Sequence, residues 1–185
     1  MDMTRGSLKK QILFFSIPLM LSNLLQVLFN MSDIAVIGQF AGAMSLGAVG
    51  STTTLISMYT GFLIGLSGGI NVLTALYIGA RNRKSVSETV HSAFLVSLVV
   101  GLILLILGVS TSRGVLVLLN TKEELIDKAA LYIRIYFLGI PALALYNFGN
   151  AVFSAAGDTG RPLRYLFLSG IVNVILNLFL SLIHI

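Results

Sequence analysis

The chain has 185 residues, of which 56% are hydrophobic and 10% are charged. A soluble globular domain carries about 25% charged residues, so this chain has too few charges to cover a water-soluble surface. It contains no cysteine and only two histidines, which excludes a disulfide scaffold and argues against a zinc enzyme. The net charge is +5, but the basic residues stand between apolar runs rather than on one face. We therefore expect a polytopic membrane protein that binds the lipid bilayer and no nucleic acid.

Five apolar stretches are long enough to cross a bilayer, which requires about 20 apolar residues. They do not alternate in the manner of membrane-barrel strands, so the predicted fold is an all-α membrane helix bundle. The predicted spans are roughly 11–37, 47–78, 89–110, 129–155 and 164–183. The first span is too long for a cleavable signal peptide. The apolar patch 115–119 is too short to span and predicts a turn that lies on the membrane surface.

Two prolines and a run of small residues lie inside these spans. Pro18 and Pro141 each remove one backbone hydrogen bond, so a kink is expected in the first and fourth spans. Gly61, Gly65 and Gly69 follow the small-xxx-small spacing that permits close helix packing. These features predict how the helices pack and carry no chemistry of their own.

The distribution of Lys and Arg predicts the orientation of the chain. These residues concentrate in the cytoplasmic loops of membrane proteins. Eight of them precede span one or lie between spans two and three or four and five: Arg5, Lys9, Lys10, Arg81, Arg83, Lys84, Arg161 and Arg164. The loop between spans one and two has none. We therefore expect the N-terminus to face the cytoplasm and a fifth span to end outside.

Asp33 is the acidic residue that stands within an apolar run, between Val27 and Ile37. An ionised carboxylate inside a membrane costs about 2.5–3.5 kcal/mol or more unless it faces the protein interior. Burial favours a protonated carboxyl group, whereas a bound cation favours the carboxylate. Such a residue can therefore couple proton or sodium binding to another process. The alternative is that Asp33 lies near the outer end of span one and reaches the lipid headgroups.

Polar side chains repeat along one face of four of the five spans. At 100° per residue, those of span one fall within an arc of about 80°, and those of span two within about 100°. The stripes are Asn23, Gln26, Asn30 and Asp33; Thr53, Ser57, Thr60, Ser67, Asn71 and Thr74; Tyr136, Asn147, Asn150 and Ser154; and Asn173 with Asn177. The simplest assembly places these stripes around a partly hydrated cavity, with span three toward lipid. The alternative is ordinary hydrogen bonding between helices.

Within this predicted cavity, we expect substrate contacts from residues of spans one, two and four. They are Gln26, Asn30, Thr53, Ser57, Asn71 and Tyr136. The sequence contains no Walker loop, GxSxG or HExxH motif, and no TVGYG channel filter. An ATP-driven pump, a hydrolase and a potassium channel are therefore not predicted, and secondary transport by a protein that is not an enzyme remains.

Three segments of the sequence resemble the multidrug and toxic compound extrusion (MATE) family of efflux transporters. They are 16–42, 65–82 and 139–180, and the last contains a Pro, paired Asn residues, a GDTGRP loop and an NxxxN helix in order. The resemblance implies two lobes of six helices in a bacterial plasma membrane. It also implies alternating access, with efflux of cationic organic drugs driven by Na⁺ or H⁺ and no other cofactor.

The resemblance also assigns roles to particular residues. Asp33 matches the acidic residue of the family's first helix, and Asn173 and Asn177 match a polar pair of the fifth helix. Some members have an acid at the second of these positions, so this chain has one carboxylate rather than two. We expect Asp33, Asn173 and Asn177, assisted by Asn147 and Asn150, to bind the coupling proton or a Na⁺ ion.

The length of the chain departs from that pattern. Five spans correspond to residues 1–180 of a partial N-terminal lobe, so a sixth helix and the C-terminal lobe would be missing. Residues 181–185 read like the translation of a sequencing adapter and are expected to be non-native. The chain is then a fragment of an efflux transporter. The alternatives are a lipid-linked oligosaccharide flippase of the same superfamily and a membrane interaction half-unit that does not transport.

Overall fold

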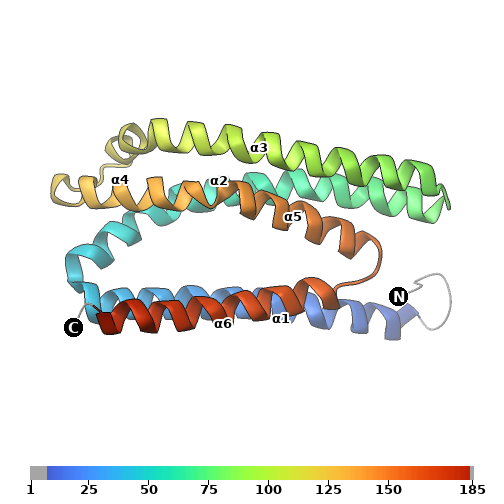
Figure 1. Ribbon diagram of the computed structural model, residues 1–185, viewed down its shortest axis with the longest axis horizontal. Helices are drawn as coiled ribbons and strands as arrows, with labels where there is room; N and C mark the ends of the chain where they lie inside the picture. The colour runs from blue at the N-terminus through green and yellow to red at the C-terminus, as the bar shows by residue number, and fades with distance from the viewer. Residues whose placement is uncertain (1–7, 184–185) are drawn as a thin grey trace. The chain divides into compact units, whose positions relative to one another are not determined.

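The computed structural model describes residues 8–183, apart from the side chains of residues 8, 178 and 180–183. Within these residues the regular structure is helical, which confirms the predicted all-α class (Figure 1). The elements are α1 (Leu8–Val36), the π-helical turn η1 (Ile37–Ala41), α2 (Gly42–Gly79), α3 (Arg83–Leu118), α4 (Glu123–Leu138), α5 (Ile140–Ala155) and α6 (Gly160–Ile183). The predicted non-native tail, 181–185, lies outside the residues whose side chains are described.

Two continuous helices among the described residues are long and apolar enough to cross a membrane, Lys9–Gly79 and Arg83–Leu118. The first has 71 residues and would measure ~107 Å if straight, against a hydrocarbon thickness of about 30 Å. Gly42, with φ of 77°, interrupts it. The first two predicted spans therefore share this helix, while α6, with 24 residues, corresponds to the fifth.

The fourth predicted span is a bent pair of helices rather than one helix. α4 and α5 together have the length and hydropathy of a span, but they meet at an angle of 48°. The break falls at Gly139, two residues before Pro141, where the missing proline N–H leaves the carbonyl group of Phe137 without its helical donor. The kink expected at Pro141 is confirmed. Pro18, by contrast, lies inside the continuous helix α1.

The predicted surface turn at 115–119 is wrong. α3 continues to Leu118, and Leu116 is fully buried within it. Within the patch, Val115 and Leu116 extend the packed face of α3 by a turn, whereas residues 117–119 are exposed. α3 has 36 residues, so it is ~54 Å long and projects beyond the hydrocarbon layer.

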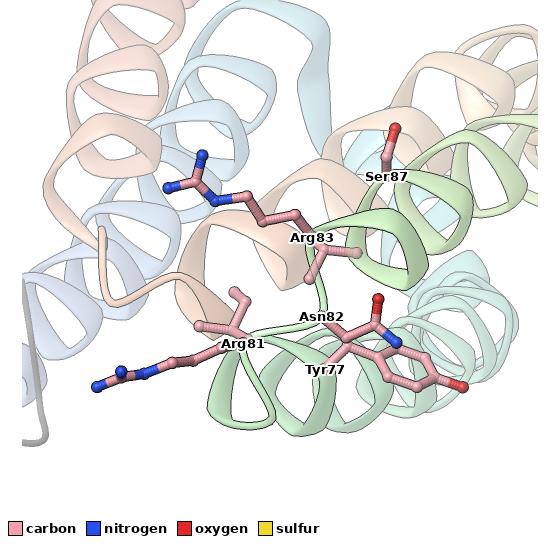
Figure 2. Close-up of a pocket in the computed structure, with 7 residues that line it drawn as sticks. Tyr77, Arg81, Asn82, Arg83 and Ser87 are labelled. Carbon is pink, nitrogen blue, oxygen red and sulfur yellow. The ribbon is translucent and has the colours of Figure 1, made fainter.

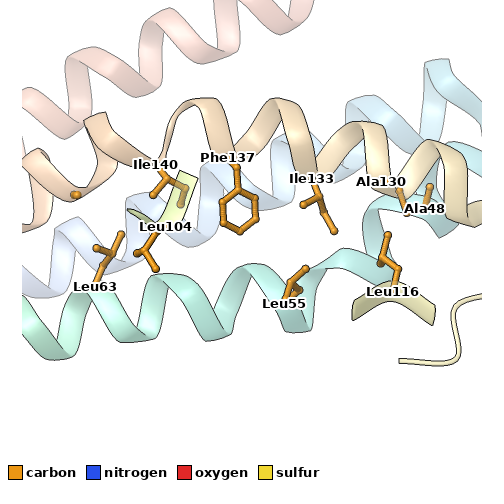
Figure 3. Close-up of a cluster of buried hydrophobic side chains, with 11 residues drawn as sticks. Ala48, Leu55, Leu63, Leu104, Leu116, Ala130, Ile133, Phe137 and Ile140 are labelled. Carbon is orange, nitrogen blue, oxygen red and sulfur yellow. The ribbon is translucent and has the colours of Figure 1, made fainter. Parts of the chain in front are cut away.

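The chain divides into two compact units, Met1–Ala43 with Ala156–Ile185, and Met44–Ala155. In the second unit, α3 packs directly against α4 and α5. α4 presents Ile126, Ala129, Ala130, Ile133 and Phe137 to this core at helical spacing. The ring of Phe137 lies edge-on to Tyr59 of α2, with centroids 4.7 Å apart, at the centre of the cluster in Figure 3.

The buried face of α3 consists largely of small residues. It contains Ala93, Ser97, Gly101, Leu104, Gly108, Ser112 and Leu116. The buried hydroxyls of Ser97 and Ser112 donate to carbonyl groups of their own helix at 2.7 and 3.1 Å. Small residues allow helix backbones to approach closely, which is the main source of packing energy in lipid. α3 therefore has an interior face that the expectation of a lipid-facing third span overlooked.

In the first unit, α1 and α6 pack side by side and run parallel (Figure 1). The Thr159 hydroxyl, just before α6, donates to the Phe15 carbonyl group at 3.2 Å. Asn177 donates to Asp33 at the far end of the same pair. The two contacts are 18 residues apart on both helices, or ~27 Å along the axis. The helices therefore share one register over nearly the thickness of a bilayer.

Candidate functional site

Asp33, Asn173 and Asn177 form a polar cluster between α1 and α6. The Asn177 amide nitrogen donates to Asp33 Oδ1 at 2.5 Å and to Asn173 Oδ1 at 3.3 Å. All three residues are half-buried. Asn173 and Asn177 are one turn apart and share a face of α6. Two oxygen atoms from two helices thus converge on one point, which the amide nitrogen of Asn177 occupies.

The loop before α6 sets the register that brings these residues together. Thr159 is 4% exposed, so its hydrogen bond to Phe15 is shielded from competing solvent. Asp158 Oδ1 accepts from the backbone N–H of Arg161 at 3.2 Å, and its Oδ2 pairs with the Arg161 Nε at 3.0 Å. Asp158 therefore caps the first turn of α6, while Gly157, with φ of 75°, turns the chain into it. The GDTGRP motif therefore fixes the position at which α6 begins beside α1.

Gly170 keeps the two helices close between these ends. It is buried, and a Cβ at this position would lie 1.7 Å from the ring of Phe29. Only a residue without a side chain leaves room for that ring. The close approach positions the next turns of α6, which carry Asn173 and Asn177, against α1.

The chemistry of the cluster fits a proton or a small hard cation. A carboxylate and amide oxygens are ligands of the type that such cations prefer. If the Asn177 amide rotated, its oxygen would join those of Asp33 and Asn173 around the same point. Within residues 8–183 no group of three or more His, Cys, Asp or Glu side chains is placed to hold a metal ion.

Asn147 and Asn150, the other predicted coupling residues, lie on α5 in the second unit. The Asn147 amide donates to the carbonyl group of Leu143 at 2.9 Å, and Asn150 Oδ1 accepts from the Ser154 hydroxyl at 3.5 Å. Both bonds stay within α5. Their assistance to Asp33 remains a prediction.

The predicted substrate contacts differ in their surroundings. On α1, Gln26 and Asn30 are exposed, and on α2 so are Thr53 and Ser57. Farther along α2, Asn71 is half-buried and donates to the Ala151 carbonyl group of α5 at 2.8 Å. The polar stripe of α2 thus begins on an exposed face and ends at the edge of the packed one.

Tyr136 is half-buried on α4, with its ring between those of Tyr132 and Phe137 at centroid distances of 6.4 and 6.3 Å. Asn71 and Tyr136 therefore contribute to packing within the second unit. Their contact with a substrate, like that of the exposed residues, remains a prediction.

Sequence reasoning missed one further feature, a pocket of about 520 Å³ at the turn between α2 and α3 (Figure 2). Its lining includes Tyr77, Arg81, Asn82, Arg83 and Ser87. The basic residues here served only to predict orientation. The sequence does contain a signal for this pocket, because two arginines flank one asparagine directly after a long apolar helix.

The comparisons with known proteins agree with this architecture. The MatE family model matches residues 18–179. The probable multidrug resistance protein YpnP of Bacillus subtilis is 35% identical over 177 residues, covering 95% of this chain and 39% of that protein. The probable multidrug resistance protein YoeA of the same organism is 27% identical over 173 residues, with 94% and 37% covered.

Among solved structures, a crystal structure of MATE in the bent conformation matches with a TM-score of 0.86 and 26% identity. The match covers 93% of this chain and 38% of that one. The chain thus spans less than two fifths of the length of these relatives. Because the family model covers most of the sequence and the helices superpose on a MATE structure, this chain belongs to the MatE family of multi-pass membrane transporters.

Proposed function

We propose that the complete protein containing this chain is a secondary multidrug efflux transporter that exchanges cationic organic compounds for Na⁺ or H⁺. The cluster of Asp33, Asn173 and Asn177 is the observation that carries the proposal. It contains one carboxylate and two amides between two apolar helices. A carboxylate inside a membrane is energetically costly, and such residues usually have a function. The names of the two Bacillus subtilis relatives support drugs as the substrate class.

In this mechanism Asp33 exchanges its hydrogen bond from Asn177 for a proton or a cation. Ion binding neutralises the carboxylate and frees the Asn177 amide, which changes the contact between α1 and α6. Coupling requires that the ion and the drug favour different states of the transporter or compete for one site. A drug with equal affinity for both states would shift nothing, so the polar stripes of α1 and α2 would contact the drug in only one state.

The function is tested in a bacterial strain that lacks its own efflux pumps. The complete protein, expressed from its gene, should raise the inhibitory concentrations of several unrelated cationic dyes and drugs. A matched control carries Asp33→Asn, which removes the charge with little change in volume and should abolish this resistance at equal membrane abundance. Unchanged susceptibility to all compounds, with the protein present in the membrane, would contradict the proposed efflux of drugs.

A further inference from the structure

The pocket at the α2–α3 turn lies outside the cluster around Asp33 and combines charge with an apolar wall. Arg81 and Arg83 project to the same side of the turn in Figure 2. Ile78 and Val86 line the pocket between the two helices, and Ile78 is 39% exposed. With about 520 Å³, it is large enough for a ligand of moderate size. A ligand that fills it would carry both an anionic and an apolar part.

The positive charge of the pocket is not neutralised within the described chain. In residues 8–183, Arg81 and Arg83 form no ion pair with a carboxylate. The nearest acidic residue in sequence, Glu88, pairs instead with Lys84 at 3.9 Å. Arginine binds phosphate through two parallel N–H donors. Two unpaired guanidinium groups at one turn are therefore available to an anionic ligand.

The backbone of the turn adds to this preference. Arg81 has φ of 55°, a conformation unfavourable for a residue with a Cβ, and it bends the chain so that α3 begins two residues later. Asn82 caps α3 by accepting from Ser85 N at 3.1 Å. The partial positive charge at the start of α3 then adds to that of the two arginines.

The position of the pocket identifies the source of the phosphate. It lies at the turn between two apolar helices of 38 and 36 residues, and both helices are long enough to reach the surface of a bilayer. Tyr77 lines it as well, and tyrosine is enriched at that level. Basic pockets between membrane helices bind the headgroups of anionic lipids. The apolar wall of Ile78 and Val86 would contact the upper part of an acyl chain.

We propose that this pocket binds an anionic phospholipid, with its phosphate on Arg81 and Arg83. The site is separate from the transport cluster and does not depend on the proposed efflux. It would fix the α2–α3 turn to one leaflet, on the side that the positive-inside pattern predicts to be cytoplasmic.

Native mass spectrometry of the 185-residue chain in detergent micelles tests the proposal, with added phosphatidylglycerol or phosphatidylcholine as the probe. The wild type should retain phosphatidylglycerol in preference to phosphatidylcholine. The double variant Arg81→Gln/Arg83→Gln should lose about 30-fold in affinity for phosphatidylglycerol and little for phosphatidylcholine. The matched control Lys84→Gln/Arg164→Gln removes the same charge outside the pocket and should behave like the wild type.

Circular dichroism checks that each variant keeps its helical content. Arg81→Lys/Arg83→Lys keeps the charge but not the paired donors, so it should bind with an affinity between the wild type and the glutamine variant. Equal retention of the two lipids, or equal losses in the pocket and control variants, would overturn the proposal. Displacement of the lipid by millimolar inorganic phosphate would overturn it too, because the site would then serve a free phosphate compound.

Discussion

Asp33 illustrates how a single contact separates two interpretations of a membrane carboxylate. From Lys10 to Asp33 the helix rises ~35 Å, so a helix with Lys10 at one membrane surface would bring Asp33 close to the headgroups of the other. A side chain that serves only to reach headgroups needs no partner from another helix. Asp33 instead accepts a hydrogen bond from Asn177, which itself contacts Asn173. The arrangement favours a carboxylate that faces the interior of its unit.

We predict that Asn177→Ala destabilises the chain by about 1–2 kcal/mol, because hydrogen bonds between membrane helices contribute roughly 0.6–2 kcal/mol each. The change also leaves the carboxylate of Asp33 without its donor. Unfolding of the detergent-solubilised chain, followed by circular dichroism, measures this loss. The control Asn23→Ala alters an exposed amide of α1 and should stay near the wild type. Equal effects of the two changes would show that the Asp33–Asn177 bond contributes nothing to stability.

At the scale of the elements, composition and spacing predicted the helices better than their ends or their contacts. The apolar runs indicated the helical segments, and Pro141 marked a real break, because hydropathy and a missing N–H act locally. The extension of α3 through Leu116 was missed because a short apolar patch is equally typical of a surface turn and a packed helix end. Which face of α3 is buried depends on neighbours distant in sequence, such as Phe137.

Glycine spacing alone also failed to predict which helix faces are in close contact. Gly61, Gly65 and Gly69 were expected to mark a close contact, yet a Cβ at any of them would meet nothing within 4 Å. Tight contacts lie elsewhere, for example on α3, where a Cβ at Gly108 would overlap the ring of Phe137. A small-residue pattern shows where helices can approach, and only the partner's shape decides where they do. The cluster of Asp33, Asn173 and Asn177 was predictable because a family motif, rather than spacing alone, marked its residues.

We predict that Gly108→Ala destabilises the chain by about 1–3 kcal/mol, the usual cost of overpacking. The added Cβ would lie 1.9 Å from the Phe137 ring, so α3 and α4 must separate or the ring must leave its contact with Tyr59. The same unfolding assay measures the effect. Gly114→Ala, on an open face of the same helix, should be neutral or slightly stabilising, because alanine has the higher helix propensity. A loss as large at Gly114 would contradict this account of α3 packing.

At the scale of the whole molecule, the parallel direction of α1 and α6 fits an odd number of membrane crossings between them. The side that the N-terminus faces stays a prediction. Helices that run in the same direction across a membrane are separated by an odd number of crossings. The predicted second, third and fourth spans, which correspond to α2, α3 and the bent pair α4–α5, would supply three. The same register places Lys9 and Lys10 at the end of the unit that carries Arg161.

The absence of cysteine makes this topology directly testable. Single cysteines at Lys84, Arg164 and Glu124 replace exposed side chains. In intact cells, a membrane-impermeant thiol reagent should label Glu124→Cys but neither Lys84→Cys nor Arg164→Cys, which should react only after the membrane is opened. Labelling of all three from one side would contradict the predicted orientation.

The chain spans less than two fifths of the length of its relatives, and coupling at Asp33 is the central claim of the proposed function. The most direct measurement is drug uptake into proteoliposomes that hold the complete protein under an imposed Na⁺ or H⁺ gradient. For the wild type, we predict uptake that follows one of the two gradients and stops when that gradient is dissipated. Asp33→Asn should still bind the drug but lose at least ~10-fold in gradient-driven uptake. If Asp33→Asn kept the wild-type response to the gradient, the coupling ion would bind elsewhere and the proposed role of the Asp33 cluster would be wrong.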